Sequence, residues 1–531
     1  MSYNLIDQPW ITVRHHGGTP EDMSIMDTFR RAHEVQGLGG EVPTQSFAIT
    51  RLLLAIVHGA VEGPRDLDQW KDLWGKETLP VKAIERYLNK RRTRFDLFDP
   101  VTPFFQVADL RTAKGEVSEL NKLIADVPNG HPYFTTRLGP IDSLDIPEAA
   151  RWLVHCQAFD PSGIKSGAVG DTRVKGGKGY PIGVGWSGLL GGVLAEGATL
   201  RETLLLNLIA YDGGNRSRWA EDGAAWERDH LGPGESPRTP AGPRDLYTWQ
   251  SRRIRLVRDG DHVTGVLICN GDRLTPQNMH DLEPHTAWRR SKPQEKKLGM
   301  PLVYMPRGHD PDRAIWRGLQ SMLPGAEKPQ DGNAAAAVSP LMLEWIARLT
   351  LTAIDPDHRI RLRTVGMTYG SQSATTDDII DDALDIHTLL LGADSAGLVD
   401  AAVQCVQAAE LAARAVGNLA GNIATAAGRR EVDGPTSRAT ELAYARLDDL
   451  FRTWISTLGA GDDPTERKAE WHHTAYNAVR ELGDQLIDQA SPTAWIGRVA
   501  GGRKVSTSHA DAWFRGTLRR CLPLAFPPAP E

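Results

Sequence analysis

The chain has 531 residues, 40 % of them hydrophobic and 24 % charged, which is enough for a few ordinary domains. The net charge of -6 argues against a general nucleic-acid coat, and because the acidic excess lies after Ser371, any contact with a polyanion is expected in the earlier part. No apolar run reaches the ~18 residues of a membrane span, the start lacks a signal-peptide pattern, and the cysteines stand singly, so we expect a reduced, cytoplasmic protein without membrane contact.

The first two thirds of the chain alternate between short strands, helices and loops. The apolar spacing predicts strands at 4–6 and 10–13 and a strong helix over 45–62 that ends at Gly63–Pro64. Alternating apolar residues on both sides of Asp259-Gly260-Asp261 predict a strand, a turn and a second strand. Further helices are expected over 83–92, 147–159, 200–211 and 340–354, with loops over 231–245 and 327–340.

After Ala374 the pattern becomes almost continuously helical. Short loops between long amphipathic helices favour antiparallel neighbours. The expected helices cover residues 375–391, 396–428, 436–458, 464–490 and 509–522. The sequence therefore predicts an α+β protein, with a large mixed domain over 1–375 followed by an antiparallel four-helix bundle over 376–531.

Patterns that suggest an enzyme or a metal site lack the context that such sites need. Gly183–Gly188 matches GxGxxG, but no buried strand precedes it, so a glycine-rich surface loop is the preferred interpretation and a nucleotide-dependent enzyme the alternative. His472–His473 and the aspartates over 377–385 lack metal-ligand spacing, and the aspartates suit the start of a helix. We expect no catalytic site, no cofactor and no metal.

Three basic clusters in the first part of the chain suggest a polyanion. Such clusters are usually solvated surface, so a nucleic-acid contact and a plain solvated face are left about equally open. The clusters are Lys90–Arg94, Arg289–Lys297, and Lys165, Arg173, Lys175 and Lys178 among glycines.

Seven segments, in order, resemble the large subunit (CasA family) of the type I-E CRISPR surveillance complex, Cascade. They extend over roughly the first 375 residues, and the helical remainder suits the four-helix bundle of that family. The segments are 4–13, 43–61, 95–107, 153–167, 197–209, 284–290 and 365–374.

The resemblance implies a non-catalytic subunit that recognises the protospacer-adjacent motif in double-stranded DNA and starts target unwinding. It also implies help in recruiting a separate helicase-nuclease for antiviral defence. The partners that it implies are the other Cascade subunits, the guide CRISPR RNA that they carry, the target duplex and the helicase-nuclease. A pure scaffold, in which the bundle holds other subunits, is the alternative role.

A glycine loop is the first DNA-reading device that the family implies, and residues 161–167 match it. Ser162 stands where the family has a glycine, Gly163 lets the backbone approach the groove floor, and Lys165 is the candidate phosphate contact. The glycines over 176–179 offer a second alignment, so which stretch contacts DNA stays open. The minor groove displays few distinguishing groups, so the resemblance implies a permissive motif.

A glutamine wedge is the second device, and Gln372 matches it, preceded by Ser371 where an asparagine is frequent. A glutamine amide offers both a donor and an acceptor to unpaired bases, and an inserted side chain helps to offset unstacking. From the residues alone, an ordinary turn residue is the preferred interpretation.

The third device is a basic finger on a hairpin, which we match to residues 265–278 with Arg273 at the tip. A separate family loop carries an aromatic side chain that contacts the complex or its RNA end. Phe134 is its best match here, and an ordinary core phenylalanine is the alternative.

Overall fold

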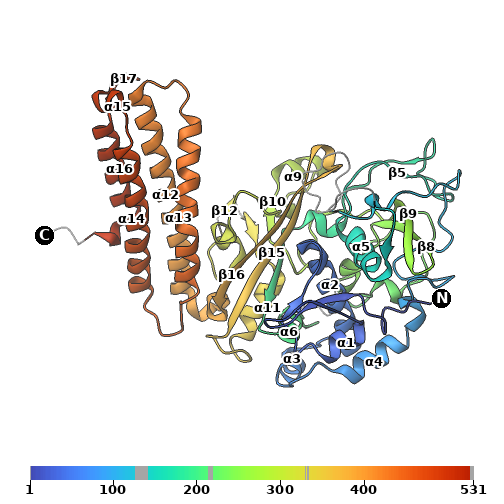
Figure 1. Cartoon of the computed structure of the whole chain (residues 1–531). Helices are drawn as coiled ribbons and strands as arrows, with labels where there is room; N and C mark the ends of the chain where they lie inside the picture. Colours follow the sequence, from blue (N-terminus) through green and yellow to red (C-terminus); the bar gives the residue numbers. More distant parts are fainter. Residues whose placement is uncertain (1, 126–140, 213–218, 329, 332–333, 527–531) are drawn as a thin grey trace. The chain divides into compact units, whose positions relative to one another are not determined.

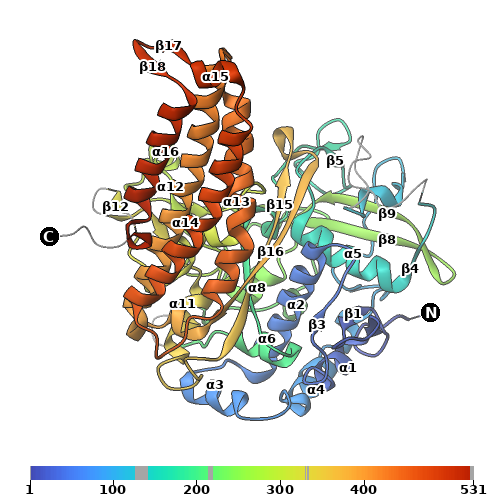
Figure 2. The same cartoon turned by 60° about the vertical axis from the view of Figure 1, so that its left-hand side comes forward.

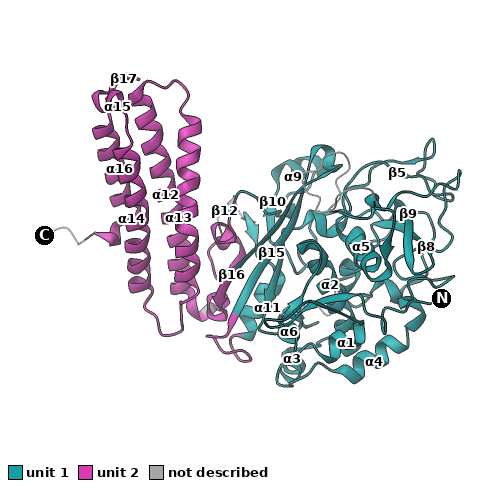
Figure 3. Ribbon diagram, viewed as in Figure 1, with its two compact units in different colours: residues 1–312, 329–349, 360–383 teal, residues 313–328, 350–359, 384–531 magenta. Residues whose placement is uncertain are grey.

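The computed structural model describes residues 2–125, 141–212, 219–328, 330–331 and 334–526 (Figure 1). They form two compact units, coloured separately in Figure 3. Unit 1 comprises 1–312, 329–349 and 360–383, and unit 2 comprises 313–328, 350–359 and 384–531. The predicted boundary at 375/376 lies inside the last segment of unit 1.

Unit 1 is built around one buried helix. The helix α2 (Pro43–Val61) is buried from Thr44 to Gly59 and ends, as predicted, just before Gly63–Pro64. By length and composition it could cross a membrane, but most of it is covered by protein, as expected of a core helix. The helices α4, α5 and α8 pack against it. The helices of unit 1 are α1 (Ile25–Arg30), α2, α3 (Leu67–Trp74), α4 (Val81–Asn89), α5 (Ile146–Phe159), α6 (Leu200–Leu206), α8 (Pro243–Tyr247), α9 (Lys292–Leu298) and α11 (Leu341–Leu349).

Small sheets surround these helices. The hairpin of β8 (Arg252–Asp259) and β9 (His262–Asn270) turns at Gly260–Asp261, which confirms the predicted strand-turn-strand. On its other side β9 pairs with β4 (Leu144–Asp145) and, in parallel, with β5 (Lys165–Ser166), which continues to β6 (Lys178–Gly179). A second sheet has the order β16-β15-β7, with β15 (Arg359–Tyr369), β16 (Thr376–His387) and β7 (Gly192–Glu196). The remaining strands are β1 (Ile11–Arg14), β2 (Glu21–Met23), β3 (Gly37–Leu38), β10 (Trp288–Arg290), β11 (Tyr304–Pro306), β12 (Gln330–Asp331), β13 (Ala334–Ala335) and β14 (Ala337–Val338).

Unit 2 contains the predicted four-helix bundle. The helix α12 (Ala396–Ala427) packs against α13 (Asp433–Ile455), α14 (Pro464–Asp488) and α16 (Thr507–Cys521). Glycines let α13 approach α12 closely, since a Cβ at Gly421 would lie 2.5 Å from Thr436 Oγ1. Trp471 Nε1 donates a hydrogen bond to the carbonyl of Cys405 (3.1 Å), which ties α14 to α12. The unit also holds α10 (Leu319–Met322), α15 (Pro492–Ile496), β17 (Arg498–Ala500) and β18 (Arg503–Val505).

The helix predicted over 375–391 is wrong, because most of this segment forms β16. Its apolar residues fit a helical period, but pairing with β15 decides the outcome. The aspartates that suggested a helix start instead serve the sheet: the Asp381 carboxylate accepts hydrogen bonds from Arg363 (2.6 and 3.0 Å).

The hairpin predicted over 265–278 is also wrong. The strand β9 ends at Asn270, and residues 271–275 leave the sheet as a loop. The preceding part of this range pairs with β8, so the hairpin turn lies at the other end of β9.

Candidate nucleic-acid interface

The sequence offers two glycine-rich stretches, 161–167 and 176–179, as the candidate DNA-contacting loop. In the structure they contribute the two strands of one hairpin. Lys165 pairs with Gly179 and Ser166 with Lys178, and the Gly167 N–H donates to the Gly177 carbonyl (3.0 Å). We call residues 165–179 the glycine hairpin. The alternative between 161–167 and 176–179 therefore concerns two sides of one structure.

The tip of the glycine hairpin is a two-residue turn between lysines. Lys175 and Lys178 exchange two backbone hydrogen bonds (3.1 Å each), and Gly176 and Gly177 between them have φ of 58° and 73°. Such a turn requires positive φ at both central residues, which glycine adopts without steric cost. All four residues are exposed, and neither ammonium has an ion-pair partner in the part of the chain that the structure describes. The tip thus presents two free cations on either side of bare backbone.

Lys165, the predicted phosphate contact, faces inward instead. Its Nζ lies 2.6 Å from Asp160 Oδ2, and its side chain is only 15 % exposed. The Arg252 guanidinium donates from Nε to the same carboxylate. Burial alone would raise the pKa of Asp160, but Lys165 and Arg252 outweigh it and hold that pKa below its ordinary value. Lys165 is thus part of an internal ion-pair cluster.

Arg252 also fixes the backbone that leads into the glycine hairpin. Its Nη2 donates to the carbonyls of Asp160 (3.2 Å), Pro161 (3.1 Å) and Gly183 (2.8 Å). Ser162, which follows, is buried. Gly163 has a φ of 151°, and a Cβ at this position would meet open space. Glycine is therefore favoured here by the backbone conformation and not by crowding.

Gln372 stands at the exposed tip of the β15–β16 hairpin, in a short turn over Ser371–Ser373. Gln372 (φ 55°) and Ser373 (φ 54°) both adopt the left-handed conformation, which costs a non-glycine residue about 1–2 kcal/mol. Backbone hydrogen bonds from Ser373 to Gly370 (2.8 Å) and from Gly370 to Thr375 (3.0 Å) hold the turn. Ser371 and Gln372 are exposed, and the Gln372 amide has no partner among the described residues. Backbone strain of this kind clusters at functional sites, so the turn is a candidate site.

The Gln372 hairpin is joined to the backbone that enters the glycine hairpin. The Tyr369 hydroxyl, at the end of β15, donates to the carbonyl of Phe159 (2.7 Å), the last residue of α5. Between the two hairpins lies a cavity of about 120 Å³ whose lining includes Lys122, Ile164, Lys165, Thr375 and Thr376. The base of the glycine hairpin and the residues that follow the Gln372 turn therefore border one cavity of unit 1, whereas Lys175–Lys178 and Gln372 are not among the residues that line it.

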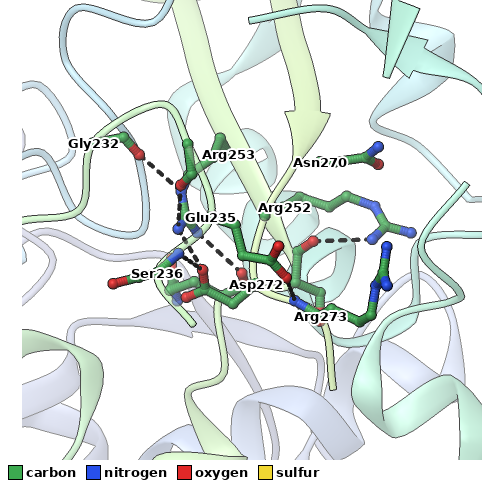
Figure 4. A network of polar contacts seen from close by, with 12 residues as sticks. Gly232, Glu235, Ser236, Arg252, Arg253, Asn270, Asp272 and Arg273 are labelled. Atoms are coloured by element: carbon green, nitrogen blue, oxygen red, sulfur yellow. Dashed lines mark hydrogen bonds and ion pairs between the residues drawn. The ribbon is translucent and has the colours of Figure 1, made fainter. Parts of the chain in front are cut away.

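Arg273 lies beside a network of polar contacts (Figure 4) and is not among the residues that line that cavity. The buried pair of Arg253 and Asp272 (2.6 Å) holds this region, and Arg253 donates to the Gly232 and Gly234 carbonyls (2.9 Å each). The Arg273 N–H donates to Glu235 (3.2 Å), while its side chain is exposed. Arg273 is thus available to an anion, although it follows β9 and is not at a hairpin tip. Phe134 lies outside the described residues.

Comparison with known proteins shows the family to which the chain belongs. The family model described as CRISPR-associated protein Cse1 matches residues 4–482. This chain belongs to the Cse1 family. The predicted CasA resemblance is therefore confirmed.

Three relatives show how far the likeness extends. The crystal structure of Thermobifida fusca Cse1 is 47 % identical, covers 99 % of each chain and has a TM-score of 0.92. That of Cse1 from Acidimicrobium ferrooxidans is 32 % identical, covers 99 % of this chain and 98 % of that one, and has a TM-score of 0.83. A curated CasA/Cse1 protein of Thermus thermophilus is 32 % identical over 344 residues, and the match spans 63 % of this chain and 62 % of that relative.

Of the three motif glycines in Gly183–Gly188 of this Cse1-family chain, Gly185 and Gly188 are explained by close packing, whereas Gly183 has a φ of 110° and open space around its Cβ position. A Cβ at Gly185 would lie 2.5 Å from the backbone of Ala158, and one at Gly188 would overlap the Tyr369 hydroxyl. Both glycines lie at the junction of α5 and β15. These two glycines therefore serve the contact between α5 and β15. Among the residues that the structure describes, no group of three or more His, Cys, Asp or Glu side chains is arranged to hold a metal ion.

The other basic clusters differ in their surroundings. In Lys90–Arg94, Arg91 pairs with Glu227 (2.9 Å), Arg92 pairs with Asp7 and Arg94 donates to the Arg228 carbonyl (2.9 Å). The three arginines therefore have partners, although Lys90 and Arg92 are exposed. In Arg289–Lys297, Arg290 pairs with Glu295 (2.7 Å), whereas Lys296 and Lys297 are exposed on α9.

Sequence reasoning missed three features of this candidate interface. Lys175 and Lys178 were recognised as basic residues but not as the flanks of a turn, although Lys-Gly-Gly-Lys is a readable hairpin signal. The inward pairing of Lys165 with Asp160, and the Tyr369 bond to Phe159, depend on long-range packing that carries no local signal.

Proposed function

We propose that this chain is the Cascade subunit that recognises the protospacer-adjacent motif in double-stranded DNA, starts target unwinding and helps to recruit the helicase-nuclease. The observation that carries this proposal is the shared cavity between the glycine hairpin and the Gln372 hairpin, whose supports are joined by the Tyr369–Phe159 hydrogen bond. Membership of the Cse1 family supports it.

The glycine hairpin suits contact with a DNA groove. Gly176 and Gly177 carry no side chains, so their backbone reaches a groove floor that a Cβ would block, and Lys175 and Lys178 meet the phosphates. The minor groove separates A·T from G·C pairs mainly by the guanine amino group. A backbone reader there accepts several related motifs, with groove shape as a further determinant.

Gln372 suits the separation of the first base pair. Its amide is unpaired and held in a fixed, strained turn, so it enters the base stack without first losing a hydrogen bond. Insertion costs a few kcal/mol per unstacked step, which contacts to the freed base edges help to offset. Because the turn is tied through Tyr369 to α5, insertion and phosphate contact act at one fixed spacing.

In this proposal the chain has no catalytic site of its own and acts in the cytoplasm. Its partners are the other Cascade subunits and the guide CRISPR RNA, which reads the rest of the target by base pairing. A chain of a structure titled CRISPR RNA-guided surveillance complex shares the fold, with 21 % identity and a TM-score of 0.72.

The decisive experiment compares guide-loaded complexes with and without this chain on matched duplexes whose flanking motif is intact or scrambled. The proposal expects binding and strand opening to require the chain and to prefer the intact motif. Equal binding and equal preference without it would instead make the chain a scaffold.

A further inference from the structure

One end of the helical bundle carries an unusual concentration of exposed apolar side chains. The short helix α15 and the hairpin β17–β18 lie at this end (Figures 1 and 2). We call residues 492–505, together with Trp513 on α16, the bundle-tip surface. Its exposed apolar side chains are Trp495 (47 % exposed), Ile496 (77 %), Val499 (74 %) and Trp513 (42 %).

One face of the β17–β18 hairpin packs against the bundle, and the opposite face is exposed. Val505 packs in a buried cluster with Ala426 and Ala494. Val499 pairs directly with Lys504, one position along from the Arg498–Val505 pair, so Val499 and Lys504 share the opposite face. Arg498 Nε donates to the Ala426 carbonyl (3.3 Å) at the end of α12, which anchors the hairpin to the bundle.

Basic groups without ion-pair partners among the described residues lie at the same end of the bundle. Arg503 and Lys504 of β18, and Arg429 and Arg430 between α12 and α13, are exposed. None of these four has an ion-pair partner within the described ranges. Of the nearby carboxylates, Asp511 is bound to Arg515 (2.7 Å). Three others, Glu431, Asp433 and Asp488, are outnumbered by the basic groups, although the sequence after Leu384 is acidic as a whole.

We propose that the bundle-tip surface binds single-stranded nucleic acid. Half-exposed indole rings are stacking platforms for unpaired bases, and neighbouring free cations follow the phosphate backbone. A duplex keeps its bases stacked inside and cannot use the indoles in this way. An apolar protein partner would gain nothing from four unpaired cations beside the contact. This inference concerns unit 2 and does not depend on motif recognition by unit 1.

The test measures fluorescence anisotropy of labelled dT20, U20 and a matched duplex with the full chain at several salt concentrations. To lower the contribution of unit 1, every variant is made in a Lys175→Ser, Lys178→Ser background. Trp495→Ala is expected to weaken binding of both single strands about tenfold, within the range for loss of one stacked base. Arg503→Ser with Lys504→Ser is expected to flatten the slope of log K against log salt by about 1.4.

Leu442→Ala is the matched control, because Leu442 on α13 is also 47 % exposed and lies outside the bundle-tip surface. It is expected to change nothing. A 4-thiothymidine strand gives a second readout that needs no folded variant, with cross-links expected within 492–513. The inference would be overturned by any of three results. These are unchanged affinity of the tip variants for single strands, a loss of duplex binding equal to the loss of single-strand binding, or cross-links confined to unit 1. If the guide-loaded complex with the wild-type chain showed no motif preference while the tip cross-links were intact, only the proposed function would be contradicted.

Discussion

The Tyr369 hydroxyl donates a hydrogen bond to the carbonyl of Phe159 (2.7 Å) and so joins two segments that lie 210 residues apart in the sequence. Tyr369 ends the strand that leads to Gln372, and Phe159 ends the helix that leads to the glycine hairpin. Burial raises the pKa of Tyr369 well above its ordinary value, so the hydroxyl remains a donor at all physiological pH values. The bond therefore acts as a permanent spacer between the two proposed DNA-reading devices.

Tyr369→Phe tests this spacer. Removal of the hydroxyl leaves a buried carbonyl without its partner, which costs about 1–3 kcal/mol of folding free energy. We expect a lower melting temperature and slower target opening by the assembled complex. Tyr247→Phe is the matched control, since it removes another buried hydroxyl of unit 1, which contacts His285 (2.9 Å). It should lower stability to a similar extent and leave opening unchanged, and a similar loss of opening in both variants would refute the spacer.

Gln372 is tested by a pair of substitutions. Gln372→Ala keeps the left-handed strain and removes the amide, so stability should stay within about 0.5 kcal/mol. Gln372→Gly also removes the strain, so this variant should be more stable than Gln372→Ala by about 1 kcal/mol. Both should bind duplex normally in a gel-shift assay and open it slowly in a 2-aminopurine fluorescence assay. If either variant opens the duplex at the wild-type rate, Gln372 is an ordinary turn residue.

The lysines of the glycine hairpin are expected to differ in their effects: some on DNA binding and one on folding stability. Lys175→Ser with Lys178→Ser should weaken duplex binding for every motif and flatten the slope of log K against log salt by about 1.8, because two free cations are lost. Lys165→Met should leave that slope unchanged and lower the urea midpoint, since Lys165 is paired with Asp160 (2.6 Å). Titrations from 50 to 300 mM salt distinguish the two. The opposite assignment, with the slope changed only by Lys165→Met, would restore the interpretation made from sequence.

The sequence identifies what is local and misses what depends on distant partners. The helices α2 and α5 follow from strong apolar periodicity, and the β8–β9 turn follows from Asp-Gly-Asp. The helix prediction for 375–391 fails because Ile379, Ile380 and Ala383 fit the apolar pattern of both a helix and a strand. Only pairing with β15 decides between these two structures. Gln372 could be located from its motif, but its left-handed conformation could not. Lys165 was assigned outward because nothing local fixes the direction in which a lysine points.

Three buried histidines of unit 1 predict how stability depends on pH. Burial lowers the pKa values of His58, His155 and His285 to about 3 each, from an ordinary value of 6.5. These side chains stay neutral in the folded state at pH 5 but become protonated on unfolding. Because the pKa is lower in the folded state, these histidines do not reduce stability above pH 6.5. As the pH falls from 6.5 towards 3, the free energy of unfolding decreases, by about 2 kcal/mol per histidine at pH 5.

We expect urea unfolding at pH 5 to take up about three more protons than at pH 8, apart from contributions of other groups, with a correspondingly lower midpoint. His155→Gln isolates one histidine, because Gln cannot be protonated and can still bond to Thr44, whose Oγ1 lies 2.9 Å from His155 Nε2. This variant should take up about one proton fewer on unfolding at pH 5, which is a third of the contribution of the three histidines. A full pH dependence in His155→Gln would show that His155 is protonated, or accessible to protons, in the folded chain.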